Sequence, residues 1–278
     1  MRVLVTGAGG RLGRTLVTQL RSETSNAVFA AVSPRQLQRA PGEVVIDLES
    51  DENITGLVLD TQPDAIVHLA GLVGPECDVD ADRTHRINVG ATATLTRVAA
   101  QCRVARLVLA STSAVYGDKY ARPIDENAAL DVRSAYAASK LSAEHAVKSG
   151  VGGTLSGIAL RIFNIYGDSF SGSLVTRLRE STADSPVTLA GLDGFVRDYV
   201  SATDVCRAIT TALRAPLDTA FDVINIGSGE ALSCGDVVDR LCQHGTLHYT
   251  VGEERQSYSV ADISKARTLL QFDPQPLA

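Results

Sequence analysis

The sequence lacks any apolar run of the roughly 18–20 residues that a membrane-spanning helix needs, so we expect no membrane segment. It also lacks the long apolar region and small-residue cleavage site of a secretory signal, and a cytoplasmic location is therefore expected. Basic residues do not dominate, since 26 Lys and Arg stand against 32 Asp and Glu, for a formal charge of −6. Nucleic-acid binding needs a basic footprint, so a nucleic acid is not the expected partner.

Cysteine is scarce and follows no ligand pattern. The five cysteines are an odd number and no Cys-x-x-Cys pair occurs, so reduced thiols are expected. His and Cys lack the spacing of zinc ligands, and no metal site is expected. What is present is ordinary globular composition: 278 residues with 45% hydrophobic and 21% charged side chains, enough for a large core with an appended lobe.

Short apolar segments alternate with longer segments of helical periodicity through the first half of the chain. The apolar segments are continuous in Val, Leu, Ile and Ala, which suits parallel strands buried on both faces. They are residues 2–6, 28–32, 44–46, 65–70 and 106–110. The helical segments are residues 11–22, 53–61, 81–101 and 134–149. This order predicts an α/β fold with a Rossmann-type, doubly wound parallel sheet.

The second half of the chain is less regular. The expected strands there are residues 154–162 and 221–226, and the expected helices are residues 171–181 and 203–213. We predict a dinucleotide-binding domain over residues 1–166, to which residues 200–229 return. Residues 167–199 and 230–278 are expected to form a small C-terminal substrate-binding lobe, packed tightly because no Pro/Gly/Ser-rich linker precedes it.

A glycine-rich turn follows the first expected strand. Gly7, Gly10 and Gly13 have the spacing Gly-x-x-Gly-x-x-Gly, and a helical segment begins directly there. In this context glycines permit a tight turn, close approach of the backbone to a pyrophosphate, and close helix packing, while the helix N-terminus attracts the phosphates. The turn predicts a dinucleotide site that includes Arg11 and Leu12, and the alternative is a plain glycine-rich turn.

The second expected strand ends without the acid that usually holds the ribose of NAD. Ser33 and Arg35 follow it instead, and Arg suits the 2′-phosphate of NADP. NADP is therefore the expected cofactor, and the alternative is NAD, with Ser33 on the ribose and Arg35 a solvated loop charge. Asp47 is placed to accept a hydrogen bond from the adenine amine, beside Leu48, unless it is only an exposed strand-end acid.

Tyr136 and Lys140 are four residues apart in an expected helix, so they share one face. A neighbouring ammonium and an oxidised nicotinamide both favour the phenolate and would lower the ordinary tyrosine pKa of about 10. Tyr136 could then exchange a proton with a substrate oxygen while hydride moves at the carbon, and Lys140 would also hold the nicotinamide ribose. Thr112 is expected at the end of the fifth strand, within reach of the reacting oxygen, with Ser111 and Ser113 as rivals.

In these segments the sequence resembles the extended short-chain dehydrogenases/reductases, also called the NAD-dependent epimerase/dehydratase family. The matching motifs, in order, are residues 6–13, 68–70, 88–92, 112–117, 136–140, 160–167, 197–205, 225–229 and 261–266. The resemblance implies that Leu69, Ala70 and Gly71 pass near the cofactor. It also implies that Asn88 supports the active site and that the catalytic hydroxyl belongs to Thr112.

The resemblance also bears on the substrate. Relatives with the Arg-Asp-Tyr-Val pattern found at residues 197–200 mostly resemble enzymes of nucleotide-linked sugars, so Asn164 and Arg197 are expected to hold the diphosphate and sugar end. The full set of expected substrate contacts is Ser113, Asn164, Arg197 and Arg255. The alternative is that Arg197 pairs with Asp198 or Asp204 and only fixes the lobe.

Three functions are compatible with this reading. Sugar dehydratases of the family have an acid pair after the catalytic Thr, and Ser113 and Ala114 stand there, so dehydration is disfavoured. The missing acid after the second strand favours a ketoreductase that consumes NADPH on a nucleotide-linked (deoxy)sugar. The alternative is an NAD-dependent epimerase that keeps its dinucleotide. A dinucleotide-sensing regulator is less expected, because such proteins commonly lose the Tyr or Lys that this chain keeps.

The resemblance implies a homodimer that pairs its long helices, residues 81–101 and 134–149, as a four-helix bundle. Small and apolar side chains along these segments support that expectation. They are Ala91, Leu95, Val98, Ala135, Ala138 and Ala146.

Overall fold

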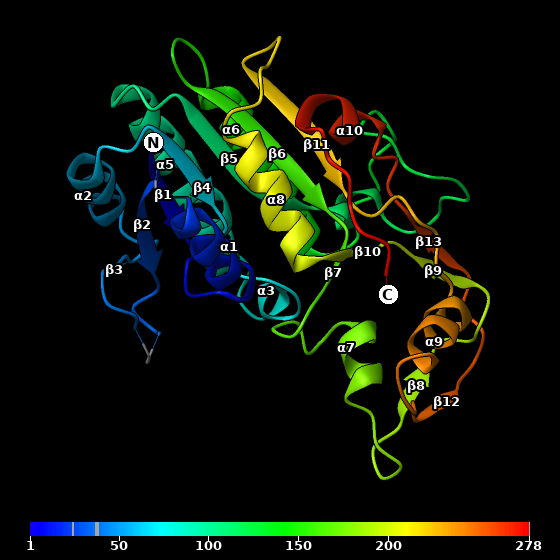
Figure 1. Ribbon diagram of the computed structural model, residues 1–278. Coiled ribbons are helices and arrows are strands. Elements are labelled where there is room, and N and C mark those ends of the chain that lie inside the picture. The colour runs from blue at the N-terminus through cyan, green and yellow to red at the C-terminus, as the bar shows by residue number, and fades with distance from the viewer. Residues whose placement is uncertain (24, 37–38, 278) are drawn as a thin grey trace.

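The computed structural model describes residues 1–23, 25–36 and 39–277. Its centre is a seven-stranded parallel sheet with the strand order β11-β6-β5-β4-β1-β2-β3 (Figure 1). These strands are β1 (Arg2–Thr6), β2 (Ala27–Val32), β3 (Glu43–Val45), β4 (Ala65–His68), β5 (Arg106–Thr112), β6 (Ser156–Ile162) and β11 (Phe221–Ile226). The strand order runs outward in both directions from β1, and ligands of such sheets bind at the carboxyl ends where the order reverses. The predicted Rossmann-type fold is confirmed.

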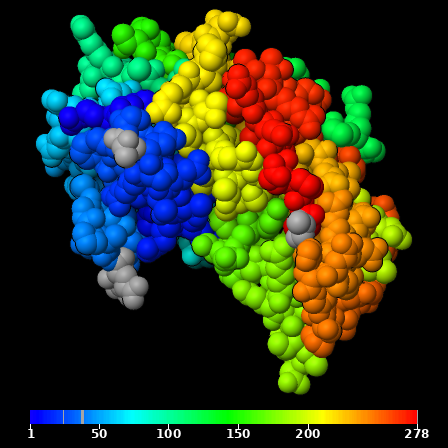
Figure 2. Space-filling model, viewed as in Figure 1, coloured from blue at the N-terminus to red at the C-terminus, as the bar shows by residue number. Residues whose placement is uncertain are grey.

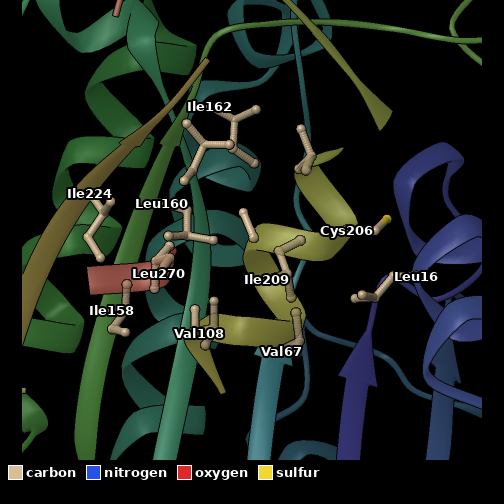
Figure 3. Packing of buried hydrophobic residues seen from close by; sticks show 14 of the residues in the cluster. Leu16, Val67, Val108, Ile158, Leu160, Ile162, Cys206, Ile209, Ile224 and Leu270 are labelled. Carbon is tan, nitrogen blue, oxygen red and sulfur yellow. The ribbon is translucent and has the colours of Figure 1, made fainter. Parts of the chain in front are cut away.

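Helices cover both faces of the sheet (Figure 1). On one face lie α2 (Asp51–Thr61), α5 (Ala91–Gln101) and α6 (Ala135–Gly150), and on the other α1 (Arg11–Ser22), α8 (Ala202–Ala212) and α10 (Ser264–Leu270). Successive side chains of a strand alternate between the faces, so Val3 joins the core beneath α1 while Leu4 joins the core beneath α2. Figure 3 shows Val67 and Val108 near Ile209 of α8, and Ile158 beside Leu270 of α10. Both faces of the sheet are therefore buried, which explains why its strands are continuous apolar runs.

One expected helix is interrupted. The sequence predicts a single helix over residues 81–101, but the structure has α4 (Ala81–His85), a π turn (Arg86–Gly90) and then α5. A π turn carries more residues per turn than an α-helix and is frequent at functional sites. It holds Asn88, whose side chain is buried. Helical periodicity alone does not reveal this turn, because the apolar face continues through it.

Two other boundaries differ from expectation in ways that affect the site. β4 ends at His68 rather than at residue 70, so Leu69, Ala70 and Gly71 belong to the loop that follows the strand. The helix expected over residues 171–181 is only α7 (Leu174–Arg179). The glycine and serine residues before it remain in a loop.

Short elements gather around a separate apolar cluster outside the main sheet. They are α7, β8 (Val187–Leu189), β9 (Phe195–Arg197) and α9 (Cys234–Cys242), and the strands β12 (Tyr249–Val251) and β13 (Ser257–Ser259) lie beside them. β8 pairs with β12 and β9 with β13, both in parallel, and β10 (Tyr199–Ser201) pairs with β7 (Asn164–Tyr166). Figure 2 shows the light green and orange stretches of chain side by side at one end of the molecule. The cluster lies in the segments expected to form a lobe, and the division into domains stays a prediction.

The helix faces cited for dimerisation do not all face outward. Ala91, Leu95 and Val98 are at most 2% exposed, because they pack in the core between α5 and the sheet. These three residues therefore cannot form an interface, and the expectation of a dimer loses that support. In the part of the chain that the structure describes, no helix has the length and apolar character to cross a membrane.

Candidate active site and dinucleotide cleft

The glycine turn after β1 is too crowded for side chains at two of its positions. Gly7 has a φ of +73°, and a Cβ there would lie 2.6 Å from the backbone nitrogen of Ala70. A Cβ at Gly13 would lie 2.2 Å from the carbonyl oxygen of Gly7. Gly10 caps α1 without a side-chain hydrogen bond, which leaves amides of the first helical turn open to a ligand. The turn therefore fits the diphosphate of a dinucleotide, as its spacing predicts.

A cavity of about 660 Å³ opens beside this turn, along the carboxyl ends of β1, β2, β3 and β4. Nine of the residues expected to bind a dinucleotide line it: Gly7, Gly10, Ser33, Arg35, Asp47, Leu48, Leu69, Ala70 and Gly71. Arg11 lines a neighbouring cavity instead, and Leu12 packs against the core. The sequence reasoning missed Arg14, whose Nε donates to the carbonyl oxygen of Gly9, and Glu49 and Arg83 in the far wall. We refer to this cavity as the dinucleotide cleft.

Thr112, Tyr136 and Lys140 come together behind the wall of the cleft. Thr112 is the last residue of β5, and its side chain shares a hydrogen bond with Tyr136 in the first turn of α6. Lys140 lies one helical turn further on and is 5% exposed. A Cβ at Gly71 would lie 3.8 Å from its Nζ, which places the ammonium beside the cleft wall. Three distant segments thus converge as the sequence predicts.

The two serines that flank Thr112 have other positions. Ser111 donates to the buried carboxylate of Glu144, so it points into the core and not toward Tyr136. Ser113 is half-buried and, together with Thr112, lines a cavity on the substrate side. The side chain of Thr112 also accepts a hydrogen bond from the backbone of Ala114 at 3.2 Å. Of the three hydroxyls, Thr112 is the one that contacts Tyr136.

Burial sets the ionisation of both catalytic candidates. It raises the pKa of Tyr136, against the opposing effect of the hydrogen bond with Thr112. It lowers the pKa of Lys140 to about 8, and the charges of Cys77 and Glu144 act in the opposite direction. The expected lowering of the Tyr136 pKa is therefore wrong for the chain alone, because burial of the phenol dominates and Lys140 is not among the groups that act on it.

Asn88 ties the loop after β4 to the helix that carries Tyr136 and Lys140. Its Oδ1 accepts from the backbone nitrogen of Leu72 at 2.7 Å, and its Nδ2 donates to the Leu72 oxygen at 3.0 Å and to Ser139 Oγ at 2.9 Å. Ser139 in turn donates to the backbone oxygen of Tyr136. Asn88 thus acts through its neighbours and does not line the cleft itself. The sequence reasoning missed Ser139, although a polar residue on the buried face of a helix is a signal for such a contact.

His68 is a fully buried neutral imidazole beneath the cleft. Its Nδ1 lies 2.6 Å from Thr6 Oγ1 and its Nε2 lies 3.0 Å from Thr92 Oγ1. Burial lowers its pKa from 6.5 to about 3, and the Lys140 ammonium adds to this effect. The ring therefore links β1, β4 and α5 without carrying a charge at neutral pH.

We expect the unfolding free energy to fall as the pH is lowered from about 6.5 toward about 3. In this window the unfolded chain binds a proton at His68 that the folded chain does not, so acid favours unfolding. Denaturant unfolding at pH 7 and pH 4 should show a smaller loss of stability in His68→Gln than in the wild type. An equal loss of unfolding free energy in the two proteins would mean that His68 does not cause the pH dependence, because the carboxylates titrate alike in both.

Two further cavities meet at Asn164 and Arg197. One, of about 350 Å³, is lined by Thr112 and Ser113 and lies on the substrate side of the catalytic residues. The other, of about 600 Å³, extends into the lobe. Both are lined by Asn164 and Arg197, so together they form one path from Thr112 to the lobe. Arg177, which the sequence reasoning missed, lines the lobe cavity, whereas Arg255 is exposed and lines neither.

Arg197 is held in place without an acidic partner on its own strand. Its guanidinium lies 3.8 Å from the ring centroid of Phe195 and donates to Ser257 Oγ at 2.7 Å. Ser257 in turn donates to Asp118 at 3.0 Å. The alternative that pairs Arg197 with Asp198 or Asp204 is therefore wrong.

The two acids have partners of their own. Asp198 accepts hydrogen bonds from the backbone nitrogens of Ser228, Gly229 and Ala261. Asp204 forms an ion pair with Arg207. With both acids engaged elsewhere, the cation of Arg197 stays available to an anionic ligand at the junction of the two cavities.

Comparison with known proteins agrees with this arrangement. Residues 3–227 match the NAD dependent epimerase/dehydratase family. The chain is 28% identical over 301 residues to an uncharacterized UDP-glucose epimerase, YtcB, of Bacillus subtilis (strain 168), an alignment that covers 99% of this chain and 93% of the relative. It is 28% identical over 249 residues to a GDP-6-deoxy-D-talose 4-dehydrogenase of Aggregatibacter actinomycetemcomitans, covering 87% of this chain and 80% of the relative. The solved structure of MoeE5 in complex with UDP-glucuronic acid and NAD superposes with a TM-score of 0.86 at 30% identity, covering 100% of this chain and 95% of that chain.

The fold, the glycine turn and the convergent Thr, Tyr and Lys define an enzyme of the extended short-chain dehydrogenase/reductase class. Within that class, the chain belongs to the NAD dependent epimerase/dehydratase family, because the family match covers most of its length.

Proposed function

We propose that this chain is an NAD-dependent epimerase of a nucleotide-linked sugar. The observation that carries the proposal is the shared position of Asn164 and Arg197 between two cavities, one that reaches Thr112 and one in the lobe. A nucleoside diphosphate sugar fits these two cavities. Its sugar would lie near Thr112, its diphosphate at Asn164 and Arg197, and its nucleoside in the lobe cavity. The named relatives support it, since YtcB is called a UDP-glucose epimerase and MoeE5 was solved with UDP-glucuronic acid.

The catalytic roles follow from the positions of three side chains. NAD bound in the cleft would supply reversible hydride-transfer chemistry. In this proposal Tyr136 takes the proton of a sugar hydroxyl as that carbon is oxidised and gives it back on reduction. Thr112 hydrogen-bonds both Tyr136 and the reacting oxygen, and the Lys140 ammonium holds the ribose and favours the phenolate once the site is filled.

NAD replaces NADP as the proposed cofactor. MoeE5 was solved with NAD, and the family is described as NAD-dependent. Arg35 is exposed, and its backbone nitrogen donates to Ser33 Oγ at 3.2 Å, so the arginine side chain extends from a short turn. In this proposal Ser33 holds the adenosine ribose and Arg35 is a solvated charge, which was the alternative left open by the sequence. Chromatography of the dinucleotide released from freshly purified protein should show NAD, and NADP alone would overturn this assignment.

The epimerase proposal is tested by incubating the purified protein with UDP-glucose and following the sugar by proton NMR. We expect conversion to UDP-galactose with no net change in reduced-nicotinamide absorbance, because each hydride removed is returned. A ketoreductase remains the second candidate, since one relative is named a sugar 4-dehydrogenase. Stoichiometric oxidation of added NADH or NADPH with a 4-keto nucleotide sugar, without epimerisation, would favour that candidate and overturn ours.

Arg197→Met is expected to raise the KM for the nucleotide sugar about tenfold or more with little change in kcat. Loss of a hydrogen bond to a charged group costs about 1.5–3 kcal/mol, and Arg197 lies away from the reacting carbon. Steady-state kinetics on both proteins measure the effect. Arg214→Met, which removes an exposed arginine paired with Glu23, is the matched control and should leave KM unchanged. An equal fall in kcat would contradict a role confined to binding.

A homodimer stays a proposal. With Leu95 and Val98 in the core, the outward residues available on α5 and α6 include Ala93 and Ala138. Light scattering at micromolar concentration measures the state, and a single chain would reject the dimer.

A further inference from the structure

A buried ion pair lies directly behind the catalytic helix. Arg161 of β6 donates from Nη2 to Glu144 Oε2 at 2.7 Å and from Nε to Oε1 at 3.0 Å. Both side chains are buried, with 6% and 3% of their surface exposed. Removing one partner of such a pair is costly, but the pair itself is weak evidence for stability, because desolvation offsets its attraction. The contacts of the pair indicate a role beyond stability.

The ion pair contacts residues on both sides of Thr112 in the sequence. Glu144 accepts the hydroxyl of Ser111, the residue before Thr112. Arg161 donates from Nη1 to the Tyr116 hydroxyl at 2.9 Å, and Tyr116 closes the 3₁₀ turn (Ser113–Tyr116) that follows Thr112. The pair thus fixes the chain on both sides of the catalytic hydroxyl.

The same pair reaches the adjacent edge of the sheet. The hydroxyl of Tyr116 donates to Asn225 Oδ1 of β11 at 2.8 Å, and the guanidinium of Arg161 lies 4.9 Å from the centroid of the Tyr116 ring. Asn225 Nδ2 donates to the backbone oxygen of Ile124. These groups form one continuous polar network from β5 through β6 to β11, and rotation of the Tyr116 turn would break it.

Glu144 also stands one helical turn after Lys140 on α6, so the two side chains share a face. The other group that acts on the Lys140 pKa from a packed element is Cys77 of α3 (Glu76–Val79). The neutral His68 of β4 lies close enough for the Lys140 charge to lower its pKa. Glu144 is therefore a formal negative charge on the Lys140 side of the catalytic helix, and its effect on the Lys140 pKa is to raise it.

We propose that Glu144 and Arg161 are positioning residues: they hold Thr112 against α6, and they fix a buried carboxylate one helical turn from Lys140. The inference rests on the proposed function for the catalytic role of Lys140, but its electrostatic part concerns this chain alone. Arg161 holds the Glu144 carboxylate by two hydrogen bonds, and Glu144 presents that carboxylate on the face of α6 that also carries Lys140. Neither residue touches the cleft.

The test is a titration of Lys140 without any dinucleotide. The sequence has four lysines, so ¹³Cε-lysine NMR gives four signals, with Lys119, Lys148 and Lys265 as internal references. In the wild type we expect Lys140 to titrate near pH 8. In Glu144→Gln, which keeps the shape and a Ser111 contact, the midpoint should fall by about one pH unit. Arg161→Lys keeps the cation, so its midpoint should stay near the wild-type value.

A double variant separates electrostatics from folding. Glu144→Gln with Arg161→Met leaves no lone buried charge, so it should recover stability that a single variant loses. Its Lys140 midpoint should nevertheless stay low, and the alkaline limb of kcat/KM should move to lower pH with it. Glu230→Gln, which breaks the partly exposed pair with Arg240, is the control and should change neither. An unchanged Lys140 midpoint in both Glu144 variants would overturn the inference, whereas absence of epimerisation alone would overturn only the proposed function.

Discussion

Replacing Tyr136 with phenylalanine is expected to reduce kcat by about 10²–10⁴-fold while leaving dinucleotide binding close to the wild-type level. That range is the usual contribution of a positioned acid–base group. The phenol hydrogen-bonds Thr112. Lys140, on the same face of α6, points toward Gly71 of the cleft wall, so it is not placed to transfer the proton in place of Tyr136. The ring itself remains, so packing is retained.

Rate and binding must be measured separately for this variant. Product formation gives kcat, and quenching of protein tyrosine fluorescence on addition of NAD gives the dissociation constant. Tyr249→Phe removes a hydroxyl from an exposed tyrosine in β12 and serves as the control, with no expected change in rate. A Tyr136→Phe protein that turns over at the wild-type rate would refute the mechanism.

Gly13→Ala is expected to destabilise the chain by about 1–3 kcal/mol and to weaken dinucleotide binding, whereas Gly56→Ala should stabilise it by about 0.5–1 kcal/mol. Both glycines lie inside helices, α1 and α2, but their surroundings differ. The added Cβ at Gly13 would press on the carbonyl oxygen of Gly7 at 2.2 Å, which deforms the turn, while nothing lies within 4 Å of the Cβ at Gly56.

The opposite signs make this comparison informative. Both substitutions lower the entropy of the unfolded chain alike, so any difference in denaturant unfolding comes from the folded state. Titration with NAD then reports whether the turn has moved. Equal stabilisation by both substitutions would mean that the turn relaxes without cost and that Gly13 is not required by its contact with Gly7.

The sheet was predictable because its signal is local. Each strand of the first half is a short, continuous apolar run, and burial on both faces requires that composition. The three side chains proposed for catalysis were found for a similar reason, because Tyr136 and Lys140 are one helical turn apart and Thr112 ends a strand. Their roles stay a prediction.

The supporting contacts were not predictable, because they join segments far apart in the chain. Asn88 reaches Ser139, 51 residues away, and Ser111 reaches Glu144, 33 residues away. A hydroxyl beside Thr112 is equally plausible as a catalytic group until its partner is known. The direction of the Tyr136 pKa shift was missed for the same reason, since burial of the phenol depends on packing by segments distant in the sequence and not on its own helix alone.

The π turn at residues 86–90 also sets the angular phase between α4 and α5. An α-helix advances about 100° per residue, so excising Val89 would rotate everything before the deletion by that angle relative to α5. Asn88 would then leave Leu72 and Ser139. A change of one residue in the length of this helix is therefore a change in the geometry around Lys140, and it would also displace Arg83 and Ile87, which line the cleft.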